Sequence, residues 1–342
     1  MPREYREILS GLIARRDLTE AETVEAMESI LEGAWSEAQI AAFLAALATK
    51  GETVEELAGA ARAMRRKAVR VQAIAPNVVD TCGTGGDRSN TFNISTTAAF
   101  IAAGAGATVA KHGNRAVSSG CGSADVLEAL GLNLQAPPEI MQEALNEIGI
   151  AFLFAPLYHG AIRHAMPVRK QLGVRTVFNM LGPLANPAGA TAQLLGVFAP
   201  TLTEAFAQTL QRLGTRRAFI VHGHDGLDEI SVCAPTRISE LRDSRVITYD
   251  LDPSQFFHEL ADPTTLKGGT VSENAAILRA ILDGTDHSPR RNVALLNAAA
   301  ALMAVGLAPD WKAGVALAAA SVDSGAALAK LESLAAFTQR NG

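Results

Sequence analysis

The sequence of 342 residues predicts an α/β protein: a small all-helical N-terminal domain followed by a larger α/β domain with a central, mostly parallel sheet. Three observations predict this fold. The first 70 residues carry helical apolar patterns and no convincing strand. From Val78 onward, short apolar or β-branched runs alternate with helical stretches. Glycine-rich polar loops follow two of these runs, where α/β sheets bind their ligands.

The N-terminal region contains four amphipathic helical patterns. Their apolar faces consist of Ile8, Leu12 and Ile13; Val24, Met27, Ile30 and Leu31; Ile40 to Leu47; and Leu57 to Met64. Three capping boxes mark helix starts, at Thr19-x-x-Glu22, Ser36-x-x-Gln39 and Thr53-x-x-Glu56. We therefore expect a helical domain over residues 1–72.

Six short runs are expected to form the strands of the sheet. They are Val78–Asp80, Thr108–Lys111, Ile150–Phe154, Leu194–Phe198, Ala218–His222 and Ile230–Ala234. Two alanine-rich stretches, 294–304 and 315–320, are too short to cross a membrane and are typical of buried helices that pack through small side chains.

The first polar loop lies within residues 80–96 and has the chemistry of a phosphate site. Gly83, Gly85 and Gly86 can adopt positive φ angles, so that successive backbone N–H groups form one concavity. A helix predicted from Ile94 to Ala103 would add the unpaired N–H groups of its N-terminus. Its first residues, Asn93, Ser95 and Thr96, serve as N-caps, as ligands or as both. The loop has neither a Walker ending nor a dinucleotide fingerprint, and alone it is a weak signal.

A second polar loop strengthens that signal. Lys111-His-Gly-Asn-Arg115 follows a predicted strand and continues into Ser118, Ser119, Gly120, Gly122 and Ser123. Cationic side chains beside glycine and asparagine suit a polyanionic substrate, although a solvated surface loop is the alternative. The two loops belong to one strand-loop-helix-strand-loop unit.

A third cluster, Asp225-Gly-Leu-Asp-Glu229, follows the run that ends at His222. Taken alone, it is equally well explained as an Asp-Gly turn with acidic neighbours. Beside two phosphate-binding loops it favours Mg²⁺, which commonly bridges protein carboxylates and substrate phosphates. We interpret Asp225 as a turn residue.

Composition narrows the functional class. The chain has 30 basic and 35 acidic residues, a net charge of −5, which gives no general attraction to nucleic acid or to anionic membranes. Cys82, Cys121 and Cys233 have no metal-site spacing and form no even disulfide set, and the sequence shows no signal peptide or membrane span. We expect a cytoplasmic protein. Cys82 has no evident base partner and is not expected to be a nucleophile.

These motifs resemble those of the anthranilate phosphoribosyltransferases of tryptophan biosynthesis, in order and in spacing. The resemblance covers nearly the whole chain. It is carried by Gly83-Thr-Gly-Gly-Asp87, Asn93-Ile-Ser-Thr96, Lys111-His-Gly-Asn-Arg115, Gly122-Ser-Ala-Asp-Val-Leu-Glu-Ala-Leu-Gly131, the stretch from Val168 to Pro187, His222-Gly-His-Asp-Gly-Leu-Asp-Glu229 and Leu295-Leu-Asn-Ala-Ala-Ala-Ala301. Two residues depart from it: Arg88 stands where the family more often has glycine, and Cys121 replaces a usually polar or charged residue.

The resemblance implies both the architecture and the reaction. Residues from about 166 to 190 would rejoin the helical domain, leaving 73–165 and 191–342 as the α/β domain, with the substrate cleft between the two. The reaction would transfer the phosphoribosyl group of 5-phosphoribosyl 1-diphosphate to the amine of anthranilate, with Mg²⁺ assisting departure of diphosphate. A homodimer is implied as well, and neither nucleic acid nor a membrane is expected as a partner.

The resemblance also implies the site residues. Binding of the phosphoribosyl donor is expected from Gly83, Gly86, Asp87, Thr91, Asn93, Ile94, Ser95, Thr96, Lys111, His112, Gly113, Asn114, Arg115, Ala116, Val117, Ser118, Ser119 and Ser123. Anthranilate is expected to contact Gly83, Asn114, Arg169, His159 and Pro183, and the metal to contact Ser95, Asp228 and Glu229.

Within this set, Arg169 suits the anthranilate carboxylate because a guanidinium binds it in a bidentate manner. Outside the motif, an arginine at this place would be read as part of a solvated helix face. His112 and His159 are weaker candidates, since structural histidines are common. An aryl amine needs no strong general base, so we expect no covalent intermediate and keep His112 as the one candidate catalytic residue.

Two alternative functions are considered. A pyrimidine nucleoside phosphorylase of the same fold would resemble Lys-His-Ser-Gly where this chain has Lys111-His-Gly-Asn114. A nucleic-acid-binding paralogue should have lost the Gly-Thr-Gly-Gly-Asp loop and gained a basic surface. The intact loop and the negative net charge argue against the paralogue, and a salt-dependent DNA-binding assay would distinguish it.

Overall fold

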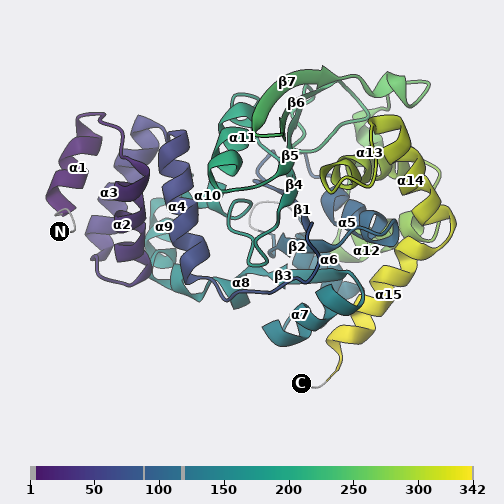
Figure 1. The fold of residues 1–342 in the computed structure, drawn as a ribbon, viewed down its shortest axis with the longest axis horizontal. Coiled ribbons are helices and arrows are strands. Elements are labelled where there is room, and N and C mark those ends of the chain that lie inside the picture. Colours follow the sequence, from purple (N-terminus) through teal and green to yellow (C-terminus); the bar gives the residue numbers. More distant parts are fainter. Residues whose placement is uncertain (1–4, 88, 117–119, 341–342) are drawn as a thin grey trace.

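A helical lobe and an α/β body, joined side by side, make up the molecule (Figure 1). The computed structural model describes residues 5–87, 89–116 and 120–340. The helical lobe contains α1 (Tyr5–Ile13), α2 (Glu20–Leu31), α3 (Glu37–Lys50) and α4 (Val54–Lys67). The four helices predicted from the apolar patterns are confirmed. So are the three capping boxes, in each of which the N-cap side chain and the N3 side chain bond each other's backbone N–H.

The sheet of the α/β body has seven strands in the order β3-β2-β1-β4-β5-β6-β7. The strands are β1 (Val79–Gly83), β2 (Val109–Gly113), β3 (Ile150–Phe154), β4 (Ala192–Gly196), β5 (Arg217–Gly223), β6 (Thr236–Arg242) and β7 (Arg245–Leu251). The first five pair in parallel, and β6 and β7 add an antiparallel hairpin. The mostly parallel sheet is therefore confirmed.

The predicted strand over Ile230–Ala234 is wrong. This run is mostly buried, but it pairs with no strand of the described residues. The N–H groups of Ile230 and Ser231 donate to side chains, and the carbonyl of Val232 accepts from the N–H of Ala261. Asn297 accepts from the N–H of Ile230 at 3.0 Å and donates to its carbonyl at 2.9 Å. Strands β6 and β7 were not predicted; their hairpin turn at Asp243 and Ser244 has positive φ at both residues.

Helices cover both faces of the sheet. They are α5 (Ile94–Gly104), α6 (Ser123–Ala129), α7 (Pro138–Glu147), α8 (Ala155–Tyr158), α11 (Leu202–Arg212), α12 (Val271–Leu282), α13 (Pro289–Ala304), α14 (Trp311–Asp323) and α15 (Ala326–Thr338), with short 3-10 turns η2 (Pro253–Gln255) and η3 (Pro263–Leu266). Leu194 and Phe219 lie in the core that contains α5 and α13, whereas Leu195 and Ile220 lie in the core that contains α11. This division follows from the alternation of side chains along a strand.

The alanine-rich stretches are helical, as predicted. Residues 293–304 of α13 are buried throughout, while α14 is only partly buried. No single helix of the described residues is long and apolar enough to cross a membrane; α14 and α15 meet that test only as a pair, across a bend of 62°.

The segment between β3 and β4 packs with the helical lobe. It contains η1 (Gly160–His164), α9 (Met166–Leu172) and α10 (Phe178–Leu181). Val168 and Leu181 share one hydrophobic core with Met64 of α4 and Phe206 of α11. The second core therefore runs from the helical lobe to one face of the sheet without a break. The domain boundaries at 72, 165 and 190 stay predictions.

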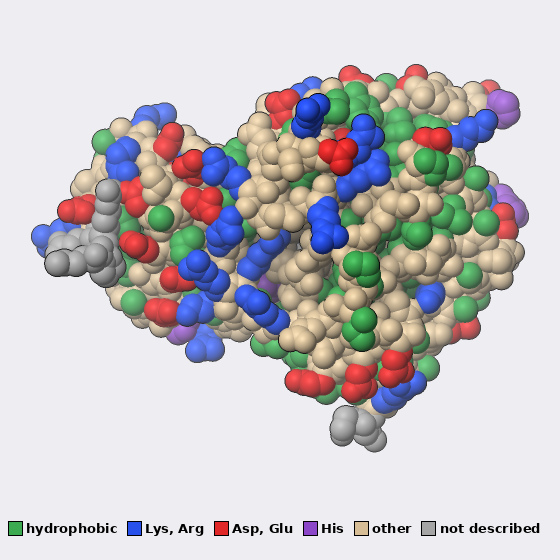
Figure 2. All heavy atoms as spheres, viewed as in Figure 1, with side chains coloured by type: hydrophobic (Ala, Val, Ile, Leu, Met, Phe, Trp, Pro, Cys, Tyr) green, Lys and Arg blue, Asp and Glu red, His purple; other side chains and the backbone are tan. Residues whose placement is uncertain are grey.

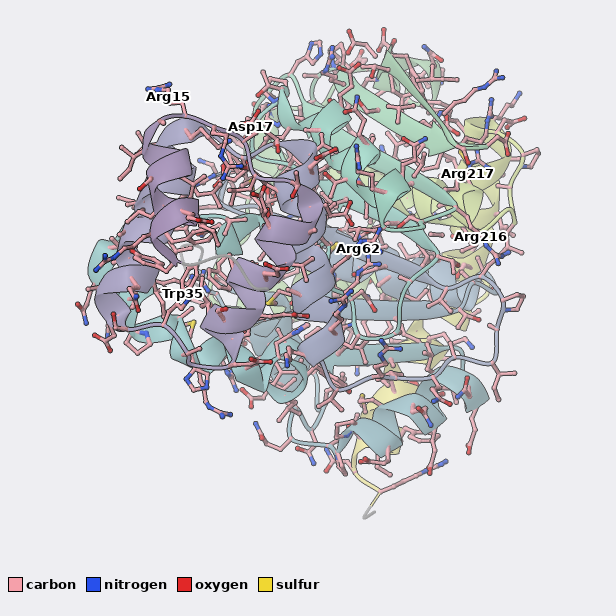
Figure 3. All side chains as sticks on the ribbon, turned by 60° about the vertical axis from the view of Figure 1, so that its left-hand side comes forward. Arg15, Asp17, Trp35, Arg62, Arg216 and Arg217 are labelled. Carbon is pink, nitrogen blue, oxygen red and sulfur yellow. The ribbon has the colours of Figure 1, made fainter. Side chains whose placement is uncertain are left out.

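Arginines of α4 hold the lobe against the C-terminal end of α11. Arg62, seen between lobe and body in Figure 3, donates to the carbonyl of Arg212 at 2.6 Å, and Arg65 donates to that of Leu213 at 3.3 Å. Cations at the last carbonyls of a helix are favourable because the helix dipole is negative there. On the face seen in Figure 2, Lys and Arg side chains gather along this junction.

Candidate active site

A cleft of about 870 Å³ opens at the carboxyl ends of β1 and β2, where the two glycine-rich loops meet the α9–α10 segment. The predicted site residues that line it are Gly83, Gly86, Asp87, Thr91, Asn93, Ile94, Ser95, Thr96, Lys111, His112, Gly113, Asn114, Arg115, Ala116, Ser123, Arg169, Asp228 and Glu229. Val117, Ser118 and Ser119, and the departing residue Arg88, lie outside the described residues. His159 and Pro183 are buried and do not line the cleft.

The conformation of the first loop depends on its glycines and on one carboxylate. Gly85 and Gly86 have φ angles of 64° and 81°, as expected, and the N–H of Gly85 donates to Asp228 Oδ2 at 3.0 Å. Gly83 differs from the expectation: it ends β1 without a positive φ. A side chain is excluded there because a Cβ would lie 2.7 Å from Asp228 Oδ2.

The start of α5 faces the acidic pair. The N–H of Ser95 donates to Glu229 Oε1 at 3.0 Å, so this helix N-terminus already binds a carboxylate. Asn93 occupies the N-cap position, but its side chain does not cap the helix as predicted. Its Nδ2 donates to the carbonyl of Cys121 at 3.2 Å instead, which joins the two glycine-rich loops.

Lys111 crosses the floor of the cleft from β2. Its Nζ donates to the carbonyl of Thr81 at 2.5 Å and reaches Ser95 Oγ at 3.4 Å. Only 3% of its surface is exposed. Burial lowers the pKa of Lys111, and the nearby charge of Asp80 opposes that effect.

Asp80 is a buried carboxylate that the sequence analysis did not select. Its Oδ1 accepts the N–H of His112 at 3.0 Å, and its Oδ2 accepts Asn186 Nδ2 at 2.8 Å. Asn186 Nδ2 also donates to the carbonyl of Ala110. Burial raises the pKa of Asp80, while Lys111 lowers it. Asp80 thus ties β1, β2 and the segment before β4 together directly beneath the cleft.

The second loop closes on itself through α6. Asp125 Oδ2 accepts the N–H groups of Ala116 at 3.0 Å and Gly122 at 2.9 Å, and Ser123 Oγ donates to the carbonyl of Asn114. The Arg115 guanidinium pairs with Asp125 at 2.9 Å and also with Glu128. Most of its hydrogen-bonding capacity is therefore engaged by carboxylates of α6. Cys121, the other departing residue, is buried.

Asp228 and Glu229 form a crowded acidic pair. Burial raises the pKa of Asp228 to about 7, aided by the charge of Asp87, and raises that of Glu229 to about 8, aided by Asp228. Glu229 Oε2 is buried and has no hydrogen-bond partner in the part of the chain that the structure describes. A divalent cation fits this set, because it would supply both the missing partner and the missing positive charge. Within the described residues no group of three or more His, Cys, Asp or Glu side chains is arranged to hold a metal ion, so further oxygen ligands would have to come from substrate or water.

His112 and His159 form a neutral pair. Their rings lie 5.1 Å apart in an edge-to-face arrangement. Burial lowers the pKa of His112 to about 3 and that of His159 to about 4. His112 Nδ1 lies 3.0 Å from the carbonyl of Gly182, which can only accept, so Nδ1 carries the proton. His112 Nε2 is left with a free lone pair and no partner among the described residues.

The far wall of the cleft comes from the α9–α10 segment. The Arg169 guanidinium lies 5.2 Å from the centre of the Phe178 ring and has no carboxylate partner among the residues described. Burial lowers its pKa. Sequence reasoning selected only Arg169 here; the structure adds Met166, Lys170, Gly173, Val174, Arg175, Asn179 and, from the loop after β4, Phe198. Most of these residues lie in the Val168–Pro187 motif, but nothing in the motif indicates which of them line the cleft.

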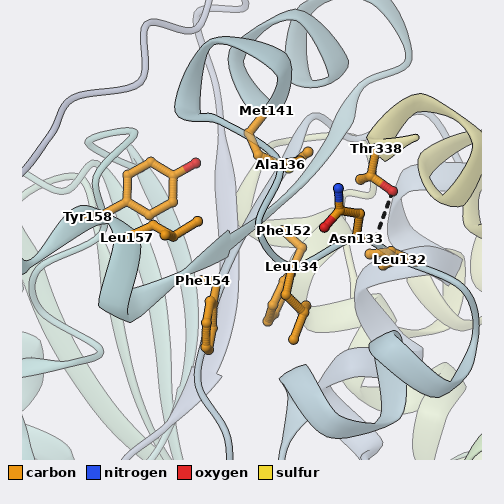
Figure 4. Close-up of a pocket in the computed structure, with 10 residues that line it drawn as sticks. All are labelled: Leu132, Asn133, Leu134, Ala136, Met141, Phe152, Phe154, Leu157, Tyr158 and Thr338. Carbon is orange, nitrogen blue, oxygen red and sulfur yellow. Dashed lines mark hydrogen bonds between the residues drawn. The ribbon is translucent and has the colours of Figure 1, made fainter. Parts of the chain in front are cut away.

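A second hollow is too small to bind a substrate. Its volume is about 10 Å³, and it lies between α7, β3 and the C-terminal helix (Figure 4). Its lining is mostly apolar and includes Met141 and Phe152, while Thr338 Oγ1 accepts the N–H of Asn133 at its edge. We interpret it as a packing defect of the core.

Known proteins resemble the chain along almost its whole length. The family described as "Glycosyl transferase family, helical bundle domain" matches residues 6–68, and "Glycosyl transferase family, a/b domain" matches residues 75–328. The anthranilate phosphoribosyltransferase of Desulfosudis oleivorans is 64% identical over 338 residues, covering 99% of this chain and 100% of that protein.

Solved structures agree with this similarity. The anthranilate phosphoribosyltransferase of Thermus thermophilus is 44% identical, superposes with a TM-score of 0.93 and covers 97% of this chain and 99% of that one. The enzyme of Saccharomyces cerevisiae, solved in complex with PRPP and Mg, is 30% identical with a TM-score of 0.89, covering 98% of this chain and 97% of that one.

Proposed function

The chain belongs to the anthranilate phosphoribosyltransferase family, and from this premise we propose that it transfers the phosphoribosyl group of 5-phosphoribosyl 1-diphosphate to the amine of anthranilate. The observation that carries the proposal is one cleft with two chemically different walls. One wall has glycine-rich loops and an acidic pair, and the other has the cation Arg169. The names of the relatives favour this activity over the phosphorylase and nucleic-acid-binding alternatives.

The donor would bind on the β1–β2 side. The backbone N–H groups of Gly86 and Asp87, those at the start of α5 that Glu229 does not engage, and Lys111 are suited to its phosphates. Mg²⁺ would be held by Asp228 and Glu229, with Ser95 nearby, and would neutralise charge on the departing diphosphate. The unpartnered Glu229 Oε2 supports this assignment. Positioning of the donor by these residues supplies most of the catalysis.

The acceptor would bind on the α9–α10 side. Arg169 is placed to bind the carboxylate of anthranilate, and Asn114 and Gly83 line the cleft between the two substrates. His159 and Pro183 would act from behind the cleft wall. The amine attacks unprotonated. His112 Nε2, which is neutral and has no partner among the described residues, is the candidate to receive the proton that the amine loses.

Two further properties belong to this proposal. We expect a homodimer joined through the helical lobe, because this family is usually dimeric. We also expect the reaction to take place in the cytoplasm, on the basis of the cysteine content of the sequence.

Loss of anthranilate fluorescence in the presence of the donor and Mg²⁺ tests the activity directly. Arg169→Ala should raise the KM for anthranilate about tenfold or more, the effect of losing one charged contact of about 1.5–3 kcal/mol, with little change in the KM for the donor. Arg163→Ala is the matched control, because Arg163 is exposed on η1 and does not line the cleft. Equal damage to both KM values in the Arg169 variant would refute the assignment.

A further inference from the structure

Arg175 joins the two walls of the cleft. It lies on the loop between α9 and α10, and its Nη2 donates to the carbonyl of Gly86 at 2.8 Å. Its guanidinium carbon stands 3.9 Å from the centre of the Phe198 ring, which lies just beyond β4. Stacking on an aromatic face together with a hydrogen bond fixes both the position and the plane of the guanidinium.

This cation has unused capacity. An arginine carries five N–H donors, and only the bond to Gly86 engages one of them among the described residues. No described carboxylate pairs with Arg175, whereas Arg115 at the other loop pairs with two. Arg175 also lines the cleft. The remaining donors are therefore available to a ligand in the cleft.

Arg175 lies where its guanidinium can bind an anion that is held by the first glycine-rich loop. The N–H of Gly85 donates to Asp228, and the carbonyl of the next residue, Gly86, accepts from Arg175. A Cβ at Gly86 would collide with Arg175 Nη2, so the glycine also makes room for the guanidinium. Because the peptide is planar and trans, fixing the Gly86 carbonyl also fixes the direction of the Asp87 N–H.

We propose that Arg175, which the α9–α10 segment contributes to the cleft, is a diphosphate-binding residue. The proposal rests on the proposed function. It gives the two arginines of this segment different ligands: Arg169 binds the carboxylate of anthranilate, and Arg175 binds the diphosphate of the donor. A guanidinium suits a diphosphate because its planar fork donates two parallel hydrogen bonds to phosphate oxygens. Phe198 serves as a positioning residue for this fork.

Calorimetric titration with inorganic diphosphate and Mg²⁺ tests the proposal without any need for turnover. Arg175→Ala should weaken diphosphate binding about tenfold or more, as expected for one charged hydrogen-bonded contact. Arg175→Lys keeps the charge without the fork and should recover part of the affinity. Phe198→Leu should give a smaller loss, and Arg163→Ala should bind diphosphate like the wild type. In steady-state kinetics, Arg175→Ala should raise the KM for the donor and leave that for anthranilate within about twofold.

Diphosphate affinity of Arg175→Ala within about twofold of the wild type would overturn the proposal. Equal increases in the KM values for donor and anthranilate would also overturn it. So would an Arg175→Lys variant that binds diphosphate as weakly as Arg175→Ala, because either result would mean that Arg175 only supports the structure of the cleft. If Arg175→Ala unfolds at a lower temperature, Arg175→Gln, which retains a donor for Gly86, takes its place in the same titration. A wild-type chain that binds diphosphate through Arg175 but modifies no anthranilate would refute the proposed function and uphold this inference.

Discussion

Individual buried charges decide how this cleft behaves. Asp228 and Glu229 are neighbours in sequence with Asp87 close by, and the charge of Lys111 partly offsets the raised pKa of Glu229. The charge of Asp80 in turn raises the pKa of Lys111 against the effect of burial. Without a further cation, the acidic pair retains protons near neutral pH. Binding of Mg²⁺ must displace those protons, which makes metal affinity depend on pH.

The acidic pair should therefore make stability depend on pH. The folded-state pKa values of about 7 for Asp228 and about 8 for Glu229 lie above the ordinary values of 3.8 and 4.5. Between those limits the folded chain holds protons that the unfolded chain has released, so stability falls as pH rises. With a chelator present to remove metal ions, we expect the Tm of the wild type to fall between about pH 5 and pH 8. The Tm of the double variant Asp228→Asn/Glu229→Gln should fall less over the same range.

Added Mg²⁺ should reverse this loss. Its gain in Tm should be larger at about pH 8 than at about pH 6, because fewer protons must be displaced. The double variant should show neither the gain nor turnover while keeping its fold. A gain that is independent of pH, or one that persists in the double variant, would contradict the metal assignment. Scanning calorimetry in chelator and in millimolar Mg²⁺ measures both effects.

At the scale of elements, glycines set how closely the helices approach. Gly104 is the last residue of α5, at the place where this helix meets α14 and α15. A Cβ on Gly104 would lie 2.6 Å from the backbone N of Ala327 and would also collide with Ser321 Oγ. Backbone atoms cannot move aside as a flexible side chain can. This contact between α5 and α15 belongs to the hydrophobic core on the face of the sheet that α5 and α13 cover.

Gly104→Ala should therefore destabilise the protein by about 1–3 kcal/mol, the usual cost of overpacking. Gly160→Ala is the control, because its added Cβ meets nothing within 4 Å and its φ is not positive. That control should be neutral or slightly stabilising, since alanine restricts the unfolded chain. Urea unfolding measures both variants, and equal midpoints would show that α5 and α15 can separate at little cost.

The connection between lobe and body is held by its own backbone carbonyls. In the strap formed by residues 182–186, the carbonyl of Gly182 contacts His112, that of Pro183 accepts from Gln193 and that of Leu184 accepts from Arg65. Asn186 completes the set through its bond to Asp80. The strap is thus fixed to the sheet and to α4 at once, which places Arg169 and Arg175 on a rigid base.

At the scale of the whole molecule, the helical lobe leaves apolar surface uncovered. Ile13 at the end of α1 is 70% exposed. Light scattering at micromolar concentration should give twice the 35.8 kDa of one chain, because we expect dimerisation through this lobe. Ile13→Glu should shift the equilibrium toward the monomer, whereas Ile74→Glu, at a position 85% exposed outside the lobe, should not. A particle of 35.8 kDa alone would refute the dimer.

Short-range patterns of residues are enough to predict the local features of this protein. Four helices, three capping boxes, five of the seven strands and the two glycine-rich loops follow from patterns only a few residues long. The hairpin of β6 and β7 and the buried loop at 230–234 did not follow, because burial alone does not say whether a backbone bonds to a strand or to a side chain such as Asn297.

Tertiary structure decided which distant groups share the cleft. Asp80 and Asn186 are 106 residues apart and Gly86 and Arg175 are 89 apart, yet each pair forms a hydrogen bond. No local pattern selects Arg175 over Lys170 or Arg169, which lie in the same basic stretch. Only the folded chain gives Arg175 an aromatic platform and a carbonyl partner. The physical reason is that periodicity and turn chemistry act over a few residues, whereas a site is made by contacts between segments that the chain brings together only when its cores have formed.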